Sequence, residues 1–359
     1  MKLAILGTRG IPARYGGFET FAEELSARLA ARGHVVTVYC RGRSGPPVWR
    51  GARLVHLPTI RHKYLDTIVH TFLSTLHLLR HRTDAALYCN AANALFTLLP
   101  RWAGIPVALN VDGIERQRRK WNALAKTWYR ISERLATWFP SAVVADARTI
   151  SNYYFHRYGK ETTYIPYGAE TGKLATTDTL DQLGLQPGCY FLYVSRMEPE
   201  NNALLVREAF ERVETDHRLV MVGDAPYAAD YIRRVRATSD PRILFPGAIY
   251  GRGYHELLSH CFAYIHATEV GGTHPALIEA MGRGALVLYL ETPENAEVAA
   301  GAAIPFREDL AEKIRAVLAM PEGEREEWRR KAEALVRERY RWDAVTEAYE
   351  QLFARLVRR

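Results

Sequence analysis

The chain has 359 residues and a formal net charge of +8, with 48% hydrophobic and 25% charged residues. This length predicts two domains of about 170 residues each, and the composition excludes a disordered chain. The positive charge favours an anionic partner. Nucleic acid, acidic lipid and a diphosphate all fit, and so does a basic surface with no such role.

Cysteine usage and hydropathy bear on where the protein works. The four cysteines lie far apart and form no C-x-x-C pair, so they predict reduced core residues, with neither a zinc site nor a disulfide frame. The chain opens directly on a strand pattern, which predicts no signal peptide. No apolar run approaches the ~20 residues that span a bilayer. We therefore expect a cytoplasmic protein.

The first half of the chain alternates short apolar runs with longer amphipathic segments such as 20–32 and 65–82, which predicts a parallel, doubly wound α/β sheet. The pattern pauses at 165–168 (I-P-Y-G), before a polar and turn-rich stretch, so we place the first domain at 1–168. The expected strands are 1–7, 35–40, 53–57, 85–88, 107–111, 142–145 and 163–165.

The strand and helix pattern then restarts, which predicts a second domain of the same class at 169–341. The tail, 342–356, has one apolar face and is expected to form a terminal helix. The expected strands of this half are 190–194, 219–222, 243–245, 263–266 and 285–290.

A glycine-rich loop at 7–20 (G-T-R-G-I-P-A-R-Y-G-G-F-E-T) follows the first strand. It is not the dinucleotide fingerprint G-x-G-x-x-G, because Arg9 fills the second glycine position. Gly16 and Gly17 precede a helix that begins near Glu19, so their N–H groups can approach a diphosphate. The alternative is an ordinary tight turn.

Segment 65–82 places His70, His77 and His81 on one helical stripe. The His77/His81 pair has the i, i+4 spacing of metal ligands. No carboxylate completes such a site nearby, so we expect surface histidines.

The segment Asn110-Val111-Asp112-Gly113-Ile114-Glu115 ends a strand, where open α/β sheets bind ligands. Asp112 is therefore a catalytic candidate, although Asp-Gly is also a common turn. Basic residues and large aromatics alternate at 116–130, from Arg116 through Lys120 to Arg130. They suit a lipid diphosphate at a membrane surface, single-stranded nucleic acid, or a helix packed through its aromatics.

Residues 268–284 (T-E-V-G-G-T-H-P-A-L-I-E-A-M-G-R-G) organise the second half. Gly271 and Gly272 open the chain after a strand, and Pro275 suits the first turn of a helix. Unpaired N–H groups at that helix start suit a phosphate. Glu279 supplies a carboxylate for the diol of a ribose.

This last segment resembles the donor-site motif of family 4 glycosyltransferases, which is a Glu, seven residues and a second Glu. Glu279 matches the second Glu, but Gly271 stands where the first belongs. The V-G-G-T-x-P form resembles the rhamnosyltransferases of bacterial polysaccharide assembly. Glu269 is an alternative carrier of the missing role, at an offset of two residues.

The resemblance implies a GT-B fold: two Rossmann-like domains that face across a cleft, with the helix at 342–359 packing back on the first domain. It implies that Asp112, Glu279 and Arg196 are catalytic. The implied donor-binding residues are Gly17, Arg196, Asn201, Gly223, Tyr250, Gly271, Gly272, Thr273 and Glu279. The implied acceptor-binding residues are Arg9, Arg14, Glu19, Asp112, Glu115, Arg116 and Lys120.

The expected function is a retaining, metal-independent transfer of a sugar, by preference L-rhamnose from dTDP-rhamnose, to a lipid-diphosphate-linked saccharide at the inner face of the cell membrane. No cofactor other than the donor is expected. No metal is expected, since the chain has no D-x-D motif, and no nucleic acid is expected, since nothing outside 116–130 supports it. The alternatives are a UDP- or GDP-sugar donor, a nucleotide-sugar epimerase of the same fold, and a non-catalytic nucleotide-sugar-binding protein.

Overall fold

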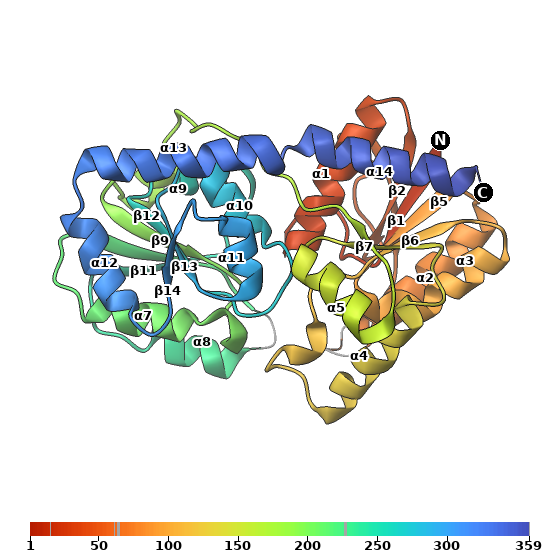
Figure 1. Ribbon diagram of the computed structural model, residues 1–359, viewed down its shortest axis with the longest axis horizontal. Coiled ribbons are helices and arrows are strands. Elements are labelled where there is room, and N and C mark those ends of the chain that lie inside the picture. The colour runs from red at the N-terminus through yellow and green to blue at the C-terminus, as the bar shows by residue number, and fades with distance from the viewer. Residues whose placement is uncertain (15, 61, 63–64, 226–227, 359) are drawn as a thin grey trace. The chain divides into compact units, whose positions relative to one another are not determined.

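A computed structural model describes residues 1–14, 16–60, 62, 65–225 and 228–358 (Figure 1). The chain divides into two compact units: unit 1 is Met1–Tyr167 with Trp342–Arg359, and unit 2 is Gly168–Arg341. The division falls one residue before the boundary expected from the sequence. Each unit is an α/β layer structure built around one sheet.

The sheet of unit 1 has the strand order β3-β4-β2-β1-β5-β6-β7-β8. All neighbours are parallel except β3 and β4, an antiparallel pair at one edge. The strands are β1 (Lys2–Leu6), β2 (Val35–Arg41), β3 (Val48–Trp49), β4 (Ala52–Leu57), β5 (Ala85–Cys89), β6 (Val107–Asn110), β7 (Ala142–Ala145) and β8 (Thr163–Tyr164).

The helices of unit 1 pack in two groups, with α1 against α14 and with α2, α3 and α4 around the 3-10 helix η1. They are α1 (Gly17–Ala31), α2 (Asp66–Arg80), η1 (Ala91–Thr97), α3 (Leu98–Trp102), η2 (Glu115–Gln117), α4 (Ala123–Ala136), α5 (Arg148–Tyr158) and α14 (Trp342–Val357).

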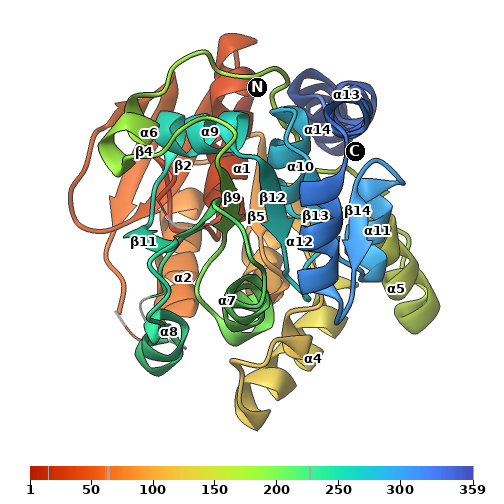
Figure 2. The same ribbon diagram turned by 90° about the vertical axis from the view of Figure 1, so that its left-hand side faces the viewer.

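The sheet of unit 2 has the order β11-β10-β9-β12-β13-β14, and all of its pairs are parallel. The side chains of β9 and β12 are almost all buried because helices cover both faces (Figure 2). The strands are β9 (Tyr190–Val194), β10 (Arg218–Val222), β11 (Ile243–Gly247), β12 (Ala263–His266), β13 (Val287–Leu290) and β14 (Ile304–Phe306).

One face of this sheet carries α7, α8 and α12, and the other carries α9, α10 and α13 (Figures 1 and 2). The helices of unit 2 are α6 (Asp178–Leu183), η3 (Pro199–Asn201), α7 (Ala203–Glu211), α8 (Ala229–Arg236), α9 (Gly251–His260), α10 (Pro275–Gly282), α11 (Pro293–Ala299), α12 (Leu310–Ala319) and α13 (Glu322–Arg339).

Each sheet has one point at which the strand order reverses. In unit 1 the chain moves outward from β1 to β2 and then returns to the other side of β1 as β5. In unit 2 it moves outward from β9 to β10 and β11 and then returns beside β9 as β12. The loops after such strand pairs diverge, which leaves room for ligands at the carboxyl edge of the sheet. The two reversal points therefore locate the candidate sites.

The terminal helix α14 belongs to unit 1. Tyr349 and Phe353 are buried, and the Tyr349 ring lies 5.4 Å from the Phe21 ring of α1. The Tyr349 hydroxyl also accepts a hydrogen bond of 3.0 Å from Nδ2 of Asn110 at the end of β6. The apolar face of α14 is therefore packed inside unit 1, where the helix lies beside α1 (Figure 1).

The structure differs from the expectations in two short strands and in the burial of one histidine. The antiparallel strand β3 and the strand β14 were not predicted, because two and three residues are too short to show a hydrophobic period. His70 is fully buried rather than on the surface, while His81 is exposed just beyond the end of α2.

No helix of the described ranges is long and apolar enough to cross a membrane.

The carboxylate of Glu256 on α9 binds the polar stretch that enters unit 2. Glu256 is 1% exposed and accepts hydrogen bonds from Oγ1 of Thr176 at 2.5 Å and from the backbone N–H of Thr179 at 2.9 Å. The hydrogen bond from Thr176, followed by that from Thr179, lowers the pKa of Glu256 to about 2 from its ordinary 4.5. The ionised carboxylate thus holds α6 against α9.

We predict that Glu256→Gln lowers the melting temperature at pH 7, because the amide cannot replace an ionised acceptor of these hydrogen bonds. A depressed pKa contributes stability above the unfolded value near 4.5, and this stability is lost as the pH falls from there towards 2. The difference between variant and wild type should therefore narrow below about pH 4.5. Thermal unfolding across this range measures it, with exposed Glu327→Gln as the control. A pH-independent difference would contradict the assignment.

Candidate active site

In unit 2, the loops after β9 and β12 are joined at the reversal point. Nδ2 of Asn202 donates to the backbone oxygen of Ala267 at 2.9 Å and to Oε1 of Glu269 at 3.0 Å. The backbone N–H of Glu269 donates to the backbone oxygen of Glu200 at 2.9 Å. Asn202 has a left-handed backbone with φ of 57°, a conformation that asparagine tolerates well. These contacts fix the carboxylate of Glu269 at the carboxyl edge of the sheet.

Arg196 and Asn201 occupy the loop after β9 in different roles. The Arg196 guanidinium is 27% exposed and lies 3.7 Å from Oε2 of Glu198. Asn201 is buried, and its Nδ2 donates to the backbone oxygen of Arg196 at 2.7 Å. Its own backbone oxygen accepts from the Tyr193 hydroxyl at 2.6 Å. Asn201 therefore shapes the loop, while Arg196 presents a charged group at its surface.

Gly223, at the end of β10, permits a close approach of two backbones. A Cβ at this position would lie 1.8 Å from the backbone oxygen of Ser195, and φ is +143°. Its N–H donates to the backbone oxygen of Gly247 at 2.9 Å. Only glycine fits here, so the residue expected to bind the donor has a clear packing role beside the Arg196 loop.

The start of α10 carries the remaining donor candidates. Gly271, Gly272 and Thr273 are buried before Pro275, which begins the helix as expected. Glu279 is the fifth residue of α10 and lies past its first turn, half-buried rather than buried. Its Oε2 accepts a 2.8 Å hydrogen bond from the Tyr254 hydroxyl of α9. Burial and the charge of Glu279 raise the pKa of Tyr254, which keeps this donor protonated.

Tyr250 lies at the N-terminal boundary of α9 and is 45% exposed. Tyr250 is therefore not a core residue. An aromatic ring at the surface beside the end of β11 has the shape to stack on a flat group such as a nucleobase.

In unit 1, carboxylates of α1 hold the glycine-rich loop after β1. Oε1 of Glu19 accepts from the backbone N–H of Arg9 at 2.8 Å, and Oε2 of Glu23 accepts from that of Ala13 at 2.6 Å. The Arg9 side chain lies 3.5 Å from Asp66, and Arg14 is exposed. Glu19 is 5% exposed, so its carboxylate serves to hold the loop rather than to bind an acceptor. Gly17 is the first residue of α1.

Asp112 stands at the carboxyl edge of the same sheet with φ of 51°. Its N–H donates to Oδ1 of Asn110 at 3.0 Å, and the Tyr167 hydroxyl lies 3.5 Å from its Oδ1. Burial, reinforced by the charge of Glu115, raises the pKa of Asp112, against the opposing effects of Arg118, of hydrogen bonding with the Asp146 side chain and of the Gly113 backbone. A left-handed backbone and a raised pKa together are typical of functional positions.

The other acceptor candidates have partners inside unit 1. Glu115 is 8% exposed and accepts a 2.7 Å hydrogen bond from Arg118. Arg116 reaches Oε1 of Glu133 at 3.2 Å and the Tyr153 hydroxyl at 2.9 Å. Lys120 lies over the ring of Trp121, at 5.1 Å. These contacts fasten η2 to α4 and α5, so Asp112 is the better placed of the acceptor candidates.

Several residues at these sites escaped the sequence analysis. Tyr167 and Asp146 approach Asp112 from distant parts of the chain, and Tyr254 reaches Glu279 from the preceding helix. Asn202 carried a local signal, since it follows the candidate Asn201 directly. Within the described ranges no group of three or more His, Cys, Asp and Glu side chains has the arrangement of a metal site.

Two Rossmann-like units, each with charged loops at its reversal point, define the GT-B class of fold. Residues 16–168 match the family model for a glycosyl transferase 4-like domain, and residues 188–320 match the model for glycosyl transferases group 1. The two matches fall in units 1 and 2 respectively. The chain is therefore a glycosyltransferase. No curated protein matches the sequence.

Solved structures support the same fold over the whole chain. HepE from Anabaena, solved with UDP and glucose, is 15% identical with a TM-score of 0.79, covering 99% of this chain and 100% of its own. Sucrose-phosphate synthase from Thermosynechococcus elongatus is 17% identical with a TM-score of 0.77, covering 99% and 98%. WaaG, a glycosyltransferase involved in lipopolysaccharide biosynthesis, is 17% identical with a TM-score of 0.73, covering 98% and 99%.

We predict that Asp112→Asn lowers sugar transfer by about 10- to 100-fold, the scale for losing a hydrogen bond between a carboxylate and the acceptor hydroxyl. Because the pKa of Asp112 is raised and the ionised carboxylate is the form that accepts this hydrogen bond, wild-type activity should fall as the pH drops through that raised value. The residual activity of the variant should lack this acidic limb. Initial rates against pH measure both effects.

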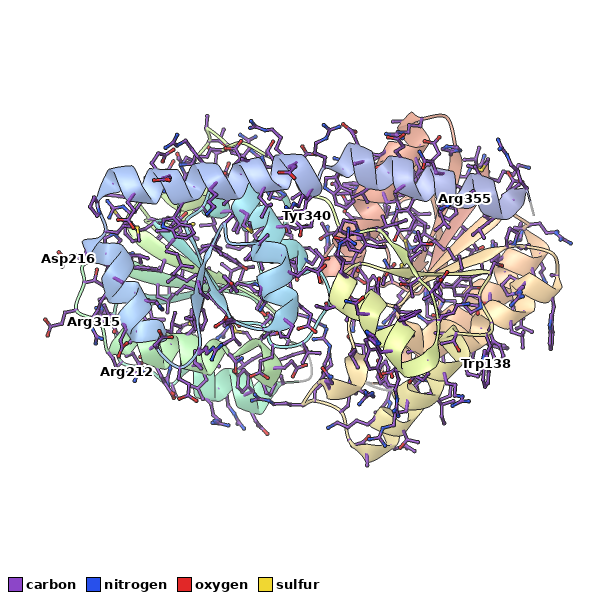
Figure 3. The ribbon with its side chains drawn as sticks, in the orientation of Figure 1. Trp138, Arg212, Asp216, Arg315, Tyr340 and Arg355 are labelled. Carbon is purple, nitrogen blue, oxygen red and sulfur yellow. The ribbon has the colours of Figure 1, made fainter. Side chains whose placement is uncertain are left out.

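Asp216→Asn is a matched control, because Asp216 is exposed on unit 2 far from the edge loops (Figure 3). Full activity of Asp112→Asn would show that the carboxylate of Asp112 is not needed to contact the acceptor hydroxyl.

Proposed function

We propose that this glycosyltransferase transfers a sugar from a nucleotide sugar with retention of anomeric configuration and without a metal. The preferred donor is dTDP-L-rhamnose, and the acceptor is a lipid-diphosphate-linked saccharide of cell-surface polysaccharide synthesis. The observation that carries the proposal is the junction of the β9 and β12 loops, where Asn202 joins Ala267 and Glu269 beside the start of α10. This junction supports a diphosphate site in unit 2.

The chemistry of that junction suits a nucleoside diphosphate. The Arg196 guanidinium can pair with phosphate oxygens, and N–H groups at the start of α10 add uncharged donors. Glu279, oriented by Tyr254, can accept hydrogen bonds from a ribose diol. The V-G-G-T-x-P segment favours a rhamnose donor. UDP is the second candidate, since HepE was solved with UDP and glucose.

The proposed chemistry is a same-face substitution. A double displacement needs a carboxylate near the anomeric carbon, and the motif position that would supply one is Gly271. The departing phosphate oxygen therefore takes the proton of the acceptor hydroxyl, while Asp112 contacts that hydroxyl. Arg196 and the N–H groups stabilise the charge that develops on the leaving diphosphate.

The first experiment is thermal unfolding of the full chain with dTDP, UDP, GDP, ADP and NAD in turn. A ligand at ~100 times its Kd stabilises the folded protein by about 2.7 kcal/mol, which is easily detected. We expect a shift with dTDP, followed by release of dTDP from dTDP-rhamnose when a lipid-linked acceptor is present. A shift in melting temperature only with UDP or GDP would indicate a UDP- or GDP-sugar as the donor.

The remaining outcomes separate the alternatives. A response to NAD alone would overturn the proposal. Donor turnover without any acceptor would indicate an epimerase, and binding without turnover a non-catalytic protein.

Membrane contact is part of the proposal, and one surface of unit 1 suits it. Of the 14 exposed large hydrophobic residues in the described chain, six lie on α2, η1, α3 and α4, elements that pack together, and a seventh, Trp138, follows α4 by two residues. We call these residues the apolar face; they are Phe72, Leu76, Leu95, Trp102, Leu124, Ile131 and Trp138 (Trp138 in Figure 3).

Exposed arginines lie on the same elements or next to them in the chain, which makes this part of unit 1 complementary to an anionic bilayer. Leu124 and Trp102 are 80% and 76% exposed, and the Arg134 guanidinium lies 5.1 Å from the Trp138 ring centroid. Tryptophan and arginine are both favoured at the lipid headgroup level. The arginines are Arg80, Arg101, Arg119, Arg130 and Arg134.

We predict that the double variant Leu124→Gln/Trp138→Gln loses at least about tenfold in binding to vesicles containing phosphatidylglycerol, since each buried apolar side chain contributes ~1.5 kcal/mol or more. Wild-type binding should weaken in high salt and on vesicles of phosphatidylcholine alone. Vesicle sedimentation measures both. Phe155→Gln, exposed on α5 outside the apolar face, is the control. Equal binding of all proteins would exclude this surface.

A further inference from the structure

Gly271 and His274 share one space at the start of α10. A Cβ built on Gly271 would lie 2.3 Å from Cε1, 2.8 Å from Nε2 and 3.0 Å from Nδ1 of His274. The φ of Gly271 lies outside the left-handed region, so its backbone would accept any residue. What excludes a side chain at position 271 is the imidazole of His274.

His274 is held from two directions. Its backbone oxygen accepts from the N–H groups of Leu277 at 3.0 Å and Ile278 at 3.3 Å, which fixes it at the N-terminal boundary of α10. Its ring centroid lies 4.9 Å from that of His266 at the end of β12. His274 remains half-buried at the carboxyl edge of the sheet.

The layer beneath His274 is buried and braced. His266 is 3% exposed, and burial lowers the pKa of its imidazole to about 3, with Asn295 acting weakly in the other direction. Nδ2 of Asn295 donates to the backbone oxygens of Thr268 and Leu290, both at 2.9 Å. This neutral, packed layer gives the ring of His274 a fixed floor at neutral pH.

We propose that His274 is a sugar-contacting residue of the donor site, and that Gly271 is glycine so that the imidazole can occupy this place. The inference rests on the proposed function. Phosphates bound by Arg196 and by the N–H groups of α10 would leave the sugar as the next group of the donor, near the start of α10 that carries His274.

The imidazole has a consequence for donor choice. A carboxylate at this position would accept hydrogen bonds from two hydroxyls, whereas an imidazole offers two ring nitrogens and a flat apolar face. Such a group favours a sugar that presents C–H groups and few hydroxyls, as a 6-deoxyhexose does. His274 is thus a specificity-determining residue for the class of sugar transferred.

The first test compares His274→Ala and His274→Gln with wild type. Loss of one sugar contact should lower kcat/KM for the donor by about 10- to 100-fold. Calorimetric Kd values for the free nucleoside diphosphate should change less than about twofold, because the contact is to the sugar. Glutamine, which keeps a donor and an acceptor, should recover part of the loss. A role confined to packing would weaken nucleotide binding as well and would show no rescue.

The second test uses the shared space. Gly271→Ala should displace the imidazole and reproduce the kinetics of His274→Ala. The double variant Gly271→Ala/His274→Ala should then be no worse than His274→Ala, which is non-additivity of a kind that independent sites do not give. His156→Ala, an exposed histidine on α5, is the control.

Two results would overturn the proposal: wild-type kinetics for His274→Ala, or additive losses in the double variant. Failure of the proposed function is distinguishable from either, since wild type would then turn over none of the nucleotide sugars offered.

Discussion

The amide of Asn202 is the contact on which the donor side of this protein depends. Its two hydrogen bonds tie the loop after β9 to the loop after β12, across the point where the strand order of unit 2 reverses. The backbone hydrogen bond from Glu269 to Glu200 ties the same two loops, so the amide adds the contact that orients the Glu269 carboxylate. Asn202 is half-buried with its Nδ2 donating to two acceptors, and losing it removes both hydrogen bonds.

Unit 1 solves the same problem with carboxylates. Glu19 and Glu23 reach back from α1 to the backbone N–H groups of Arg9 and Ala13, so the helix supplies the bonds that shape the loop before it. Negative charge near the N-terminus of a helix is also favourable by itself. The two units thus share a topology, while their edge loops are held by different chemical groups.

The regular part of the fold could be predicted from the sequence, because buried parallel strands read as apolar runs. β9, β12 and β7 begin and end where the apolar runs do. The edge strands β3 and β14 could not, since a strand of two or three residues has no period. The burial of His70 was not predicted because other elements of the fold cover it. Its position along one helix does not show which elements these are.

The candidate sites divide in the same way. Glycines and charges that follow strands, such as Gly223, Arg196 and Asp112, could be identified because the carboxyl edge is encoded locally. Their partners could not: Tyr167 lies 55 positions from Asp112, and Tyr254 lies 25 from Glu279. The sequence shows which groups lie at the edge of a sheet, whereas the packing determines which of them contact one another.

The placement of α14 has a consequence for how the protein is made. Unit 2 is one continuous stretch, but unit 1 needs Tyr349 and Phe353, which follow all of unit 2 in the chain. A ribosome therefore releases the last core residues of unit 1 only after unit 2 is complete. Unit 2 can fold as soon as it emerges from the ribosome. Residues 1–167 lack α14, which packs on α1 and on the end of β6, until synthesis ends, and they are exposed to chaperones and proteases until then.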